Sequence, residues 1–308
     1  MKIIFAGTPE FAVLPLKKIA EQRNICAVLT QPDKPQGRKG ILTPPPVKVA
    51  AEELGIKVLQ PEKLTESVEE IKALGADLMV TCAYGKILKQ ELLDIFPMGV
   101  WNIHASLLPA YRGAAPIPRV IMDGLEETGV TIMKTELGLD TGDMLLSDSL
   151  KIEKTDTCTT LSEKLSELAS GLIIEALEKI ENGNFMLTKQ GEGTLCKKVQ
   201  RTEADFSKSA AEVSSLIRGL SPSPLCFAVA DGQTFNFYMA EEVDYEGEEP
   251  YGTVLAATPK EGLIVKCGKN AVNITRIQPA GGKEMSARDF LNGRKLTKGQ
   301  RFENKSLL

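Results

Sequence analysis

Short runs of consecutive apolar residues alternate with stretches of helical spacing along the first 150 residues of the chain. The apolar runs are residues 2–7, 25–30, 77–84 and 99–104, and the stretches with helical spacing are residues 10–20, 47–55, 65–75 and 89–96. Compact apolar runs without polar alternation are typical of strands that are buried on both faces of a parallel sheet. Strands that alternate with helices indicate an α/β fold, and we predict a Rossmann-like, doubly wound, mostly parallel sheet.

Two further strands and a long helix are expected after this alternation. Residues 128–136 and 142–152 are β-rich and close together in the chain, which predicts a hairpin at one edge of the sheet. Between residues 157 and 180, leucine, alanine and isoleucine recur every three or four positions. This spacing places them on one face of a long amphipathic helix, which would close the first domain.

The pattern changes after residue 186. Residues 187–205 are polar and carry several lysines and arginines, and we interpret them as a linker. A helix is expected at residues 209–220, followed by five short β-type runs that Gly and charged turns separate. Five such runs indicate a small barrel, and we predict one of the oligonucleotide-binding (OB-like) type. The predicted division is an α/β domain at 1–186, the linker at 187–205 and an OB-like domain at 206–308.

Composition and charge are those of a globular protein with uneven charge. The 308 residues suit two domains, and 43% hydrophobic with 25% charged residues argues against disorder. A net charge of −4 excludes a uniformly basic nucleic-acid binder. However, residues 266–308 hold ten Lys or Arg against three acids, whereas residues 241–249 hold six acids and no base. A local basic surface near the C-terminal end is therefore possible.

Cysteine spacing and hydropathy bear on the compartment. The six cysteines are scattered and form no CxxC pair, so neither a zinc site nor a disulfide framework is indicated. The first residues become polar too soon for a signal peptide, and no apolar run approaches the ~20 residues that a membrane span needs. We expect a reduced, cytoplasmic protein that has no metal, does not bind a membrane and is a monomer.

The only histidine of the chain, His104, ends the apolar run at 99–104. Ligands of open α/β sheets bind beyond the carboxyl ends of the strands. Asn102 lies two residues earlier, so on an extended strand both side chains point to the same face. Asp140 follows a later predicted strand in a Gly-flanked loop, and a carboxylate beside an imidazole raises its pKa and orients it.

An amide, an imidazole and a carboxylate together suit transfer at a carbonyl. The amide and the imidazole can donate hydrogen bonds to an oxyanion, and the carboxylate can transfer protons directly or through water. From the residues alone, a purely structural His104 and a simple turn at Asp140 remain open alternatives. Other chemistries lack their motifs: there is no Gly-Lys-Ser/Thr phosphate cradle, no GxSxG elbow, no GxGxxG after the first strand and no histidine-rich metal set.

The connection at residues 31–46 is unusually long. It contains five prolines and two glycines, and Lys34, Arg38 and Lys39 make it cationic. Loops longer than ~12 residues in a compact domain are usually functional or disordered. It is therefore either a stiff surface loop or an arm that touches an anionic ligand.

Several of these segments resemble the folate-dependent formyltransferases, in particular the members that act on methionyl-tRNA. The residues that carry the resemblance are NIHASLLPAYRGAAPI at 102–117, FAGTPEFA at 5–12, QPDKPQGRKG at 31–40, AYGKIL at 83–88, LDTGDML at 139–145 and LSPSPLCFA at 220–228. They extend over nearly the whole chain, and together they are specific to this family.

The resemblance implies an enzyme that transfers the formyl group of 10-formyltetrahydrofolate to the α-amino group of methionyl initiator tRNA, for translation initiation. It implies that Asn102, His104 and Asp140 are catalytic, with Asn102 and a protonated His104 donating to the oxyanion. The residues that it places at the tetrahydrofolate site are Tyr84, Gly85, Ile87, Leu88, Ser106, Leu107, Leu108 and Pro109. Arg38, with Lys34 and Lys39, would contact the acceptor arm of the tRNA.

Alternative functions differ in which segments they need. A formyltransferase acting on UDP-amino sugars shares the Asn, His and Asp set, but it has no reason to keep the basic loop or a basic C-terminal end. Glycinamide ribonucleotide formyltransferases usually lack the extra hundred residues. Hydrolysis of the same folate is a third possibility. A non-catalytic RNA-binding protein on the same scaffold would not need Asn102, His104 and Asp140.

Overall fold

The computed structural model describes residues 1–37, 40–293 and 296–303, and the chain forms two compact units. The first unit comprises residues 1–113, 128–150 and 162–195, and the second comprises 114–127, 151–161 and the residues from Cys196 on. Each unit is therefore discontinuous in sequence. The division into 1–186, 187–205 and 206–308 stays a prediction.

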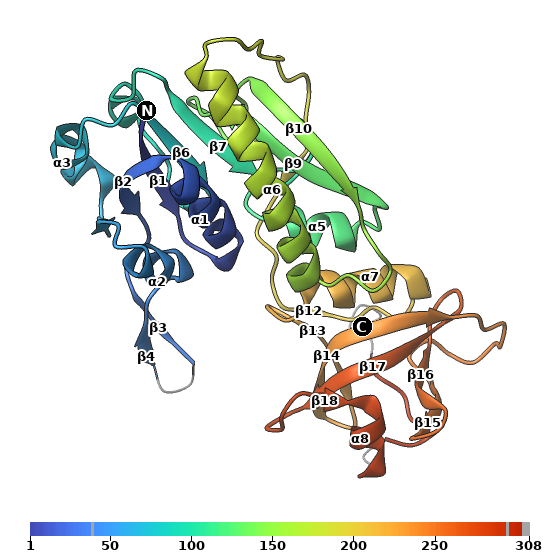
Figure 1. Ribbon diagram of the computed structural model, residues 1–308. Helices are drawn as coiled ribbons and strands as arrows, with labels where there is room; N and C mark the ends of the chain where they lie inside the picture. Colours follow the sequence, from blue (N-terminus) through green and yellow to red (C-terminus); the bar gives the residue numbers. More distant parts are fainter. Residues whose placement is uncertain (38–39, 294–295, 304–308) are drawn as a thin grey trace. The chain divides into compact units, whose positions relative to one another are not determined.

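A seven-stranded sheet forms the centre of the first unit, in the order β10-β9-β7-β6-β1-β2-β5 (Figure 1). Its strands are β1 (Lys2–Gly7), β2 (Asn24–Leu29), β5 (Val58–Leu59), β6 (Leu78–Cys82), β7 (Val100–His104), β9 (Glu127–Lys134) and β10 (Met144–Lys151). Five strands run parallel to one another, namely β5, β2, β1, β6 and β7. β9 is antiparallel to β7. The predicted α/β fold is confirmed, and the two strands expected at one edge are β9 and β10.

Helices follow the strands as the spacing predicts. The helical elements of this part of the chain are η1 (Glu10–Ala12), α1 (Val13–Gln22), α2 (Pro46–Glu53), η2 (Leu64–Glu66), α3 (Val68–Ala73), α4 (Gln90–Leu93) and α6 (Cys158–Glu181). In α6, Leu165, Leu172 and Ile180 are buried, which confirms its expected apolar face. The Ser166 hydroxyl donates to the carbonyl oxygen of Phe11 over 2.8 Å, which ties α6 to the turn that precedes α1.

The long connection at residues 31–46 contains a short antiparallel ribbon, which the sequence pattern did not predict. β3 (Lys34–Gln36) pairs with β4 (Ile41–Thr43), and the ribbon projects beyond α2 in Figure 1. At its base, the ammonium of Lys48 lies 2.8 Å from a carboxylate oxygen of Asp33. The pairing satisfies backbone groups in a segment whose prolines prevent helix formation.

The second unit is built on another seven-stranded sheet, in the order β12-β13-β14-β17-β16-β15, with β18 paired to β17. The strands are β12 (Thr202–Glu203), β13 (Cys226–Ala230), β14 (Gln233–Val243), β15 (Val254–Thr258), β16 (Gly262–Lys266), β17 (Ala271–Pro279) and β18 (Met285–Ser286), and the helices are α5 (Pro116–Met122), α7 (Ala210–Leu220) and α8 (Ala287–Asn292). The five β-type runs expected here are strands β13 to β17. The pairings give an open strand order, and closure into an OB-like barrel stays a prediction.

Aromatic side chains fill the core of this second unit. Phe206, Phe235, Phe237 and Phe302 are fully buried, and their ring centroids lie 5.6 to 6.4 Å apart in the contacting pairs. Such ring pairs add to the stabilisation from apolar burial.

A small separate sheet pairs β8 (Arg112–Gly113) with β11 (Leu195–Cys196). For the described part of the chain, none of the helices combines the length and the apolar character that crossing a bilayer requires.

Candidate active site

Asn102 and His104 lie on β7, at the end of the parallel strand where the sequence predicts a site. Asn102 is half-buried and His104 is buried. The hydroxyl of Thr81, the residue paired with Asn102 on β6, donates to Asn102 Oδ1 over 2.8 Å. Because this bond engages the oxygen of the amide, its NH₂ group is oriented away from Thr81 and left to donate to a ligand.

The imidazole of His104 is held between a carbonyl and a carboxylate. Its Nε2 lies 3.0 Å from the carbonyl oxygen of Tyr111, and since a carbonyl can only accept, Nε2 carries the hydrogen. Its Nδ1 lies 3.6 Å from Oδ2 of Asp140, so the structure brings these two predicted residues together.

Burial sets the protonation of this imidazole. It lowers the pKa of His104 below its ordinary value of 6.5, and the charge of Asp140 and the Tyr111 carbonyl raise it in part. Burial therefore favours the neutral imidazole in the free protein. The expected donation from a protonated His104 to the oxyanion stays a prediction, and the sequence does not reveal the burial that opposes this charge in the free protein.

The loop that carries Asp140 has a demanding backbone. Asp140 itself has a φ of 51°, a left-handed conformation that costs a non-glycine residue on the order of 1–3 kcal/mol. A Cβ on Gly142 would lie 1.9 Å from the carbonyl oxygen of Lys134, so only glycine fits there. The backbone N–H of Gly113 donates to Oδ2 of Asp140 over 2.8 Å. The carboxylate is thus fixed beside His104 by a loop that the LDTGD sequence makes possible.

The segment from Ser106 to Pro109 continues from β7 and is tightly held. The hydroxyl of Thr131 on β9 donates to the carbonyl oxygen of Ser106 over 2.8 Å and accepts from the backbone N–H of Leu108 over 3.1 Å. Ser106 and Leu108 are buried, and Leu107 and Pro109 are half-buried. The predicted folate role of these residues stays a prediction, but they directly follow His104.

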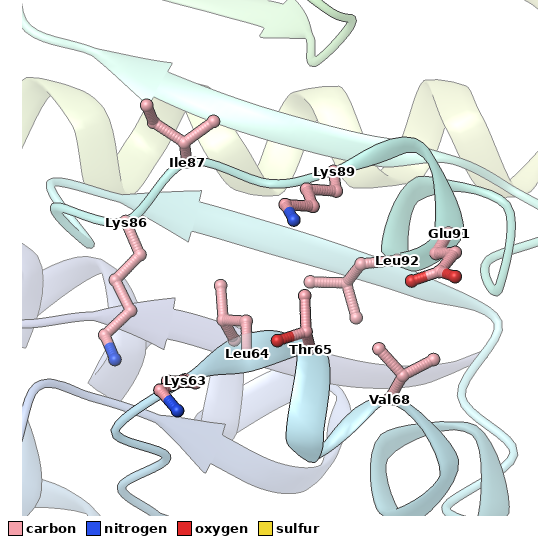
Figure 2. A pocket seen from close by; sticks show the side chains of 9 residues that line it. All are labelled: Lys63, Leu64, Thr65, Val68, Lys86, Ile87, Lys89, Glu91 and Leu92. Carbon is pink, nitrogen blue, oxygen red and sulfur yellow. The ribbon is translucent and has the colours of Figure 1, made fainter.

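The second predicted folate segment, residues 84–88, turns sharply after β6. Gly85 has a φ of 77°, and the carbonyl oxygen of Tyr84 accepts from the Thr8 hydroxyl over 3.0 Å. Leu88 is buried, whereas Ile87 is 89% exposed. Residues of this segment and of α4 border, with residues 63–68, a pocket of about 220 Å³, whose lining side chains are drawn in Figure 2. Its lining residues are Lys63, Leu64, Thr65, Val68, Lys86, Ile87, Lys89, Glu91 and Leu92.

Of the three predicted tRNA residues, the structure describes Lys34. Lys34 is exposed on β3. Arg38 and Lys39 lie outside the described residues. Nothing in the structure tests a tRNA contact at these positions.

Two residues near the site were not found from the sequence. Thr81 orients Asn102, and Gln190 donates to the backbone of the Asp140 loop. Thr81 lies in a predicted strand, and it pairs with Asn102 across β6 and β7. The sequence could have identified it only if the register between these two strands had been assumed. Gln190 falls in the segment interpreted as a linker. In the described ranges, no group of three or more His, Cys, Asp and Glu side chains could hold a metal ion.

Comparison with known proteins matches two family descriptions to this chain. Residues 1–177 match "Formyl transferase" and residues 197–295 match "Formyl transferase, C-terminal domain". Methionyl-tRNA formyltransferase of Macrococcus caseolyticus is 46% identical over 96% of each chain, and that of Neisseria meningitidis serogroup A is 44% identical over 98% of this chain and 100% of its own. That of Caldanaerobacter subterraneus subsp. tengcongensis is 43% identical over 97% and 99%.

Solved structures share the fold at low identity. HypX from Aquifex aeolicus gives a TM-score of 0.68 at 18% identity, covering 97% of this chain and 48% of that chain. An N-formyltransferase from Helicobacter canadensis, in complex with folinic acid and dTDP-3-aminofucose, gives 0.67 at 19% identity, covering 89% and 99%. The family match and the near full-length relatives together decide the assignment: the chain belongs to the formyl transferase family, among the methionyl-tRNA formyltransferases.

Proposed function

We propose that this protein transfers the formyl group of 10-formyltetrahydrofolate to the α-amino group of methionine esterified to initiator tRNA. The observation that carries the proposal is the meeting of His104 and Asp140 at the end of β7, two residues beyond Asn102. The near full-length relatives, all methionyl-tRNA formyltransferases, support the identity of the acceptor.

Folate binding is supported by the segments around β6 and β7. A pterin needs backbone donors and acceptors at its edge and apolar side chains on its faces. In the proposal, the backbone of the turn at Gly85 supplies the polar contacts, and Ile87, Leu107 and Pro109 supply the apolar ones. HypX has been solved in complex with tetrahydrofolic acid, and the formyl group would be supplied by the 10-formyl derivative in this chain.

Asn102 stabilises the oxyanion that forms when the amine attacks the formyl carbon. Its NH₂ group is the donor in this proposal, because the Thr81 hydroxyl engages its oxygen. A donor aimed at the developing charge acts mainly in the transition state, and losing one typically costs about 10²- to 10³-fold in rate.

The His104–Asp140 pair takes the proton that the attacking amine must lose. Because His104 is neutral and its Nε2–H is bound by Tyr111, the proton is accepted on the side of Nδ1, where the Asp140 carboxylate stabilises the imidazolium. The C–N10 bond then breaks, and the same proton passes to the departing nitrogen. The products are the formylated amine and tetrahydrofolate, so atoms and charge balance.

The initiator tRNA would contact the β3–β4 ribbon and the basic residues of the C-terminal part of the chain. Support comes from the exposed Lys34 and from the excess of Lys and Arg after residue 266. In the proposed division, residues 1–186 carry the chemistry, and the linker 187–205 and the OB-like domain 206–308 bind the RNA backbone. Phosphate contacts predict that tRNA affinity falls as salt rises.

One assay tests the proposal against its alternatives. The purified chain is incubated with 10-formyltetrahydrofolate and either methionyl initiator tRNA or a UDP-amino sugar, and the formylated product is identified. We expect formylmethionyl-tRNA only. Formylation of the sugar would make the protein a sugar formyltransferase, and tRNA binding without any formyl transfer would make it a non-catalytic RNA-binding protein.

A further inference from the structure

In the segment that follows α6, residues 188–194 contact the Asp140 loop and the residues that follow His104. Thr188 and Met144 exchange two backbone hydrogen bonds of 2.8 Å each. The backbone N–H of Arg112 donates to the carbonyl oxygen of Thr194 over 2.9 Å. A Cβ on Gly193 would lie 2.2 Å from the carbonyl oxygen of Pro109, so the two backbones touch. This segment is therefore held against both the strand that leaves the Asp140 loop and the residues that follow His104.

Gln190 is the residue of this segment that reaches the Asp140 loop. Its Nε2 donates to the carbonyl oxygen of Asp140 over 3.0 Å and to that of Gly142 over 2.6 Å, which uses both hydrogens of the amide. Its Oε1 accepts from Nε of Arg112 over 2.9 Å, and Nη2 of Arg112 donates to the carbonyl oxygen of Gly191 over 2.9 Å. The guanidinium fixes the direction of the amide, because Oε1 must face it.

The chemistry at this position calls for an amide. A glutamate would bring carboxylate oxygens against two carbonyl oxygens, none of which can donate. A hydrophobic side chain would leave both loop carbonyls without this donor. The half-buried Gln190 thus satisfies two acceptors of a loop whose key residue, Asp140, has a φ of 51°.

Gly113 and Gln190 together hold both ends of Asp140. The backbone N–H of Gly113, next to Arg112, donates to the carboxylate oxygen Oδ2, and the Gln190 amide donates to the main-chain oxygen of the same residue. Strained backbone persists where the surroundings over-determine it. Without the amide, the loop can relax and move the carboxylate away from Nδ1 of His104.

We propose that Gln190, oriented by Arg112, is a positioning residue that holds the Asp140 carboxylate beside His104. The inference rests on the proposed function in so far as Asp140 takes part in formyl transfer.

The test uses Gln190→Leu in the full chain, with Glu192→Gln as a matched control at an exposed position of the same segment. We expect Gln190→Leu to lower kcat by about 10- to 100-fold, as a misplacement of ~1 Å can cost 10²-fold, with KM for both substrates little changed. The control should keep wild-type kcat and KM.

A second readout follows the only histidine of the chain by NMR titration. Asp140 raises the pKa of His104, so Asp140→Asn should move its titration to lower pH. Gln190→Leu should move it in the same direction by a smaller amount, because the carboxylate is still present but displaced. A role in folding alone would change stability and leave this titration unchanged.

Arg112→Met tests whether Arg112 acts by orienting the Gln190 amide. The double variant Arg112→Met/Gln190→Leu should lose little more kcat than Gln190→Leu alone, since both changes release the same amide. If Gln190→Leu does not fold, Gln190→Met has nearly the length of glutamine and adds no charge, and it is expected to give the same two effects.

The inference is overturned if the folded Gln190 variant matches Glu192→Gln in kcat, or if kcat falls while the His104 titration stays as in wild type. Failure of the proposed function would look different. Wild-type protein would then transfer no formyl group, while the titration would still show whether Gln190 controls the contact between Asp140 and His104.

Discussion

Replacing Thr81 with valine isolates the one hydrogen bond that orients Asn102. Valine has nearly the shape of threonine but has no hydroxyl, and Thr81 is buried, with 5% of its surface exposed. The variant therefore removes the 2.8 Å bond to Asn102 Oδ1 without opening a cavity. The amide can then turn so that its oxygen faces the substrate.

The size of the effect follows from the strength of that bond. A buried neutral hydrogen bond contributes about 0.5–1.5 kcal/mol net. At about 1.4 kcal/mol per tenfold, this corresponds to a loss of about 2- to 12-fold in kcat if orientation is the whole effect. Asn102→Ala, which removes the donor itself, should lose about 10²- to 10³-fold. KM should change little in both, because the donor acts on the oxyanion of the transition state.

Thr30 supplies a matched control. It is fully buried just after β2, and its hydroxyl has no hydrogen-bond partner among the described residues. Thr30→Val should therefore leave kcat unchanged and keep or raise stability, since it removes an unsatisfied buried group. Steady-state formyl transfer and urea unfolding are measured on all variants. The reasoning is refuted if Thr81→Val is as active as Thr30→Val, or as inactive as Asn102→Ala.

Three further variants test other parts of the account. Asp140→Asn removes the charge that raises the pKa of His104, so the acid limb of kcat/KM that belongs to His104 should shift to lower pH, with kcat down by about 100-fold; an unmoved limb would contradict the coupling. Gly142→Ala places a Cβ against a β9 carbonyl oxygen, so it should lower the free energy of unfolding in urea by about 1–3 kcal/mol and also lower kcat. Wild-type stability and wild-type kcat would show that the loop tolerates a side chain. Ser209→Ala removes a capping box at α7 and should cost about 1 kcal/mol, whereas Ser67→Ala, at a helix start whose side chain makes no capping bond, should cost far less; equal costs in urea would argue against the cap.

The strands and long helices could be predicted because the local spacing of apolar residues indicates which elements are buried. The runs that became β1, β2, β6 and β7 are predominantly apolar, and α6 repeats apolar residues every three or four positions. The ribbon β3–β4 was missed because its residues are exposed and proline-rich, so no alternation marks its strands. α5 was missed as well, since only seven residues with two prolines give too short a period to recognise.

The place of the site could be predicted because ligands of open α/β sheets bind at the carboxyl ends of the strands. His104 is the only histidine and ends β7, so its place followed from the strand. The contact with Asp140 crosses 36 residues, and that of Gln190 with the same loop crosses 50, which no local pattern encodes. The lowered pKa of His104 also escaped the sequence, because burial is a property of the folded surroundings.

The central claim is that one amide and one imidazole–carboxylate pair act together on a single formyl group. It is tested most directly by the kcat of formyl transfer to methionyl initiator tRNA in the wild-type chain, His104→Ala and Asn102→Ala, each shown to be folded by urea unfolding. The account predicts transfer by the wild type and a loss of at least about 100-fold in each variant. Near-native turnover in either variant, or no transfer by the wild type, would contradict it.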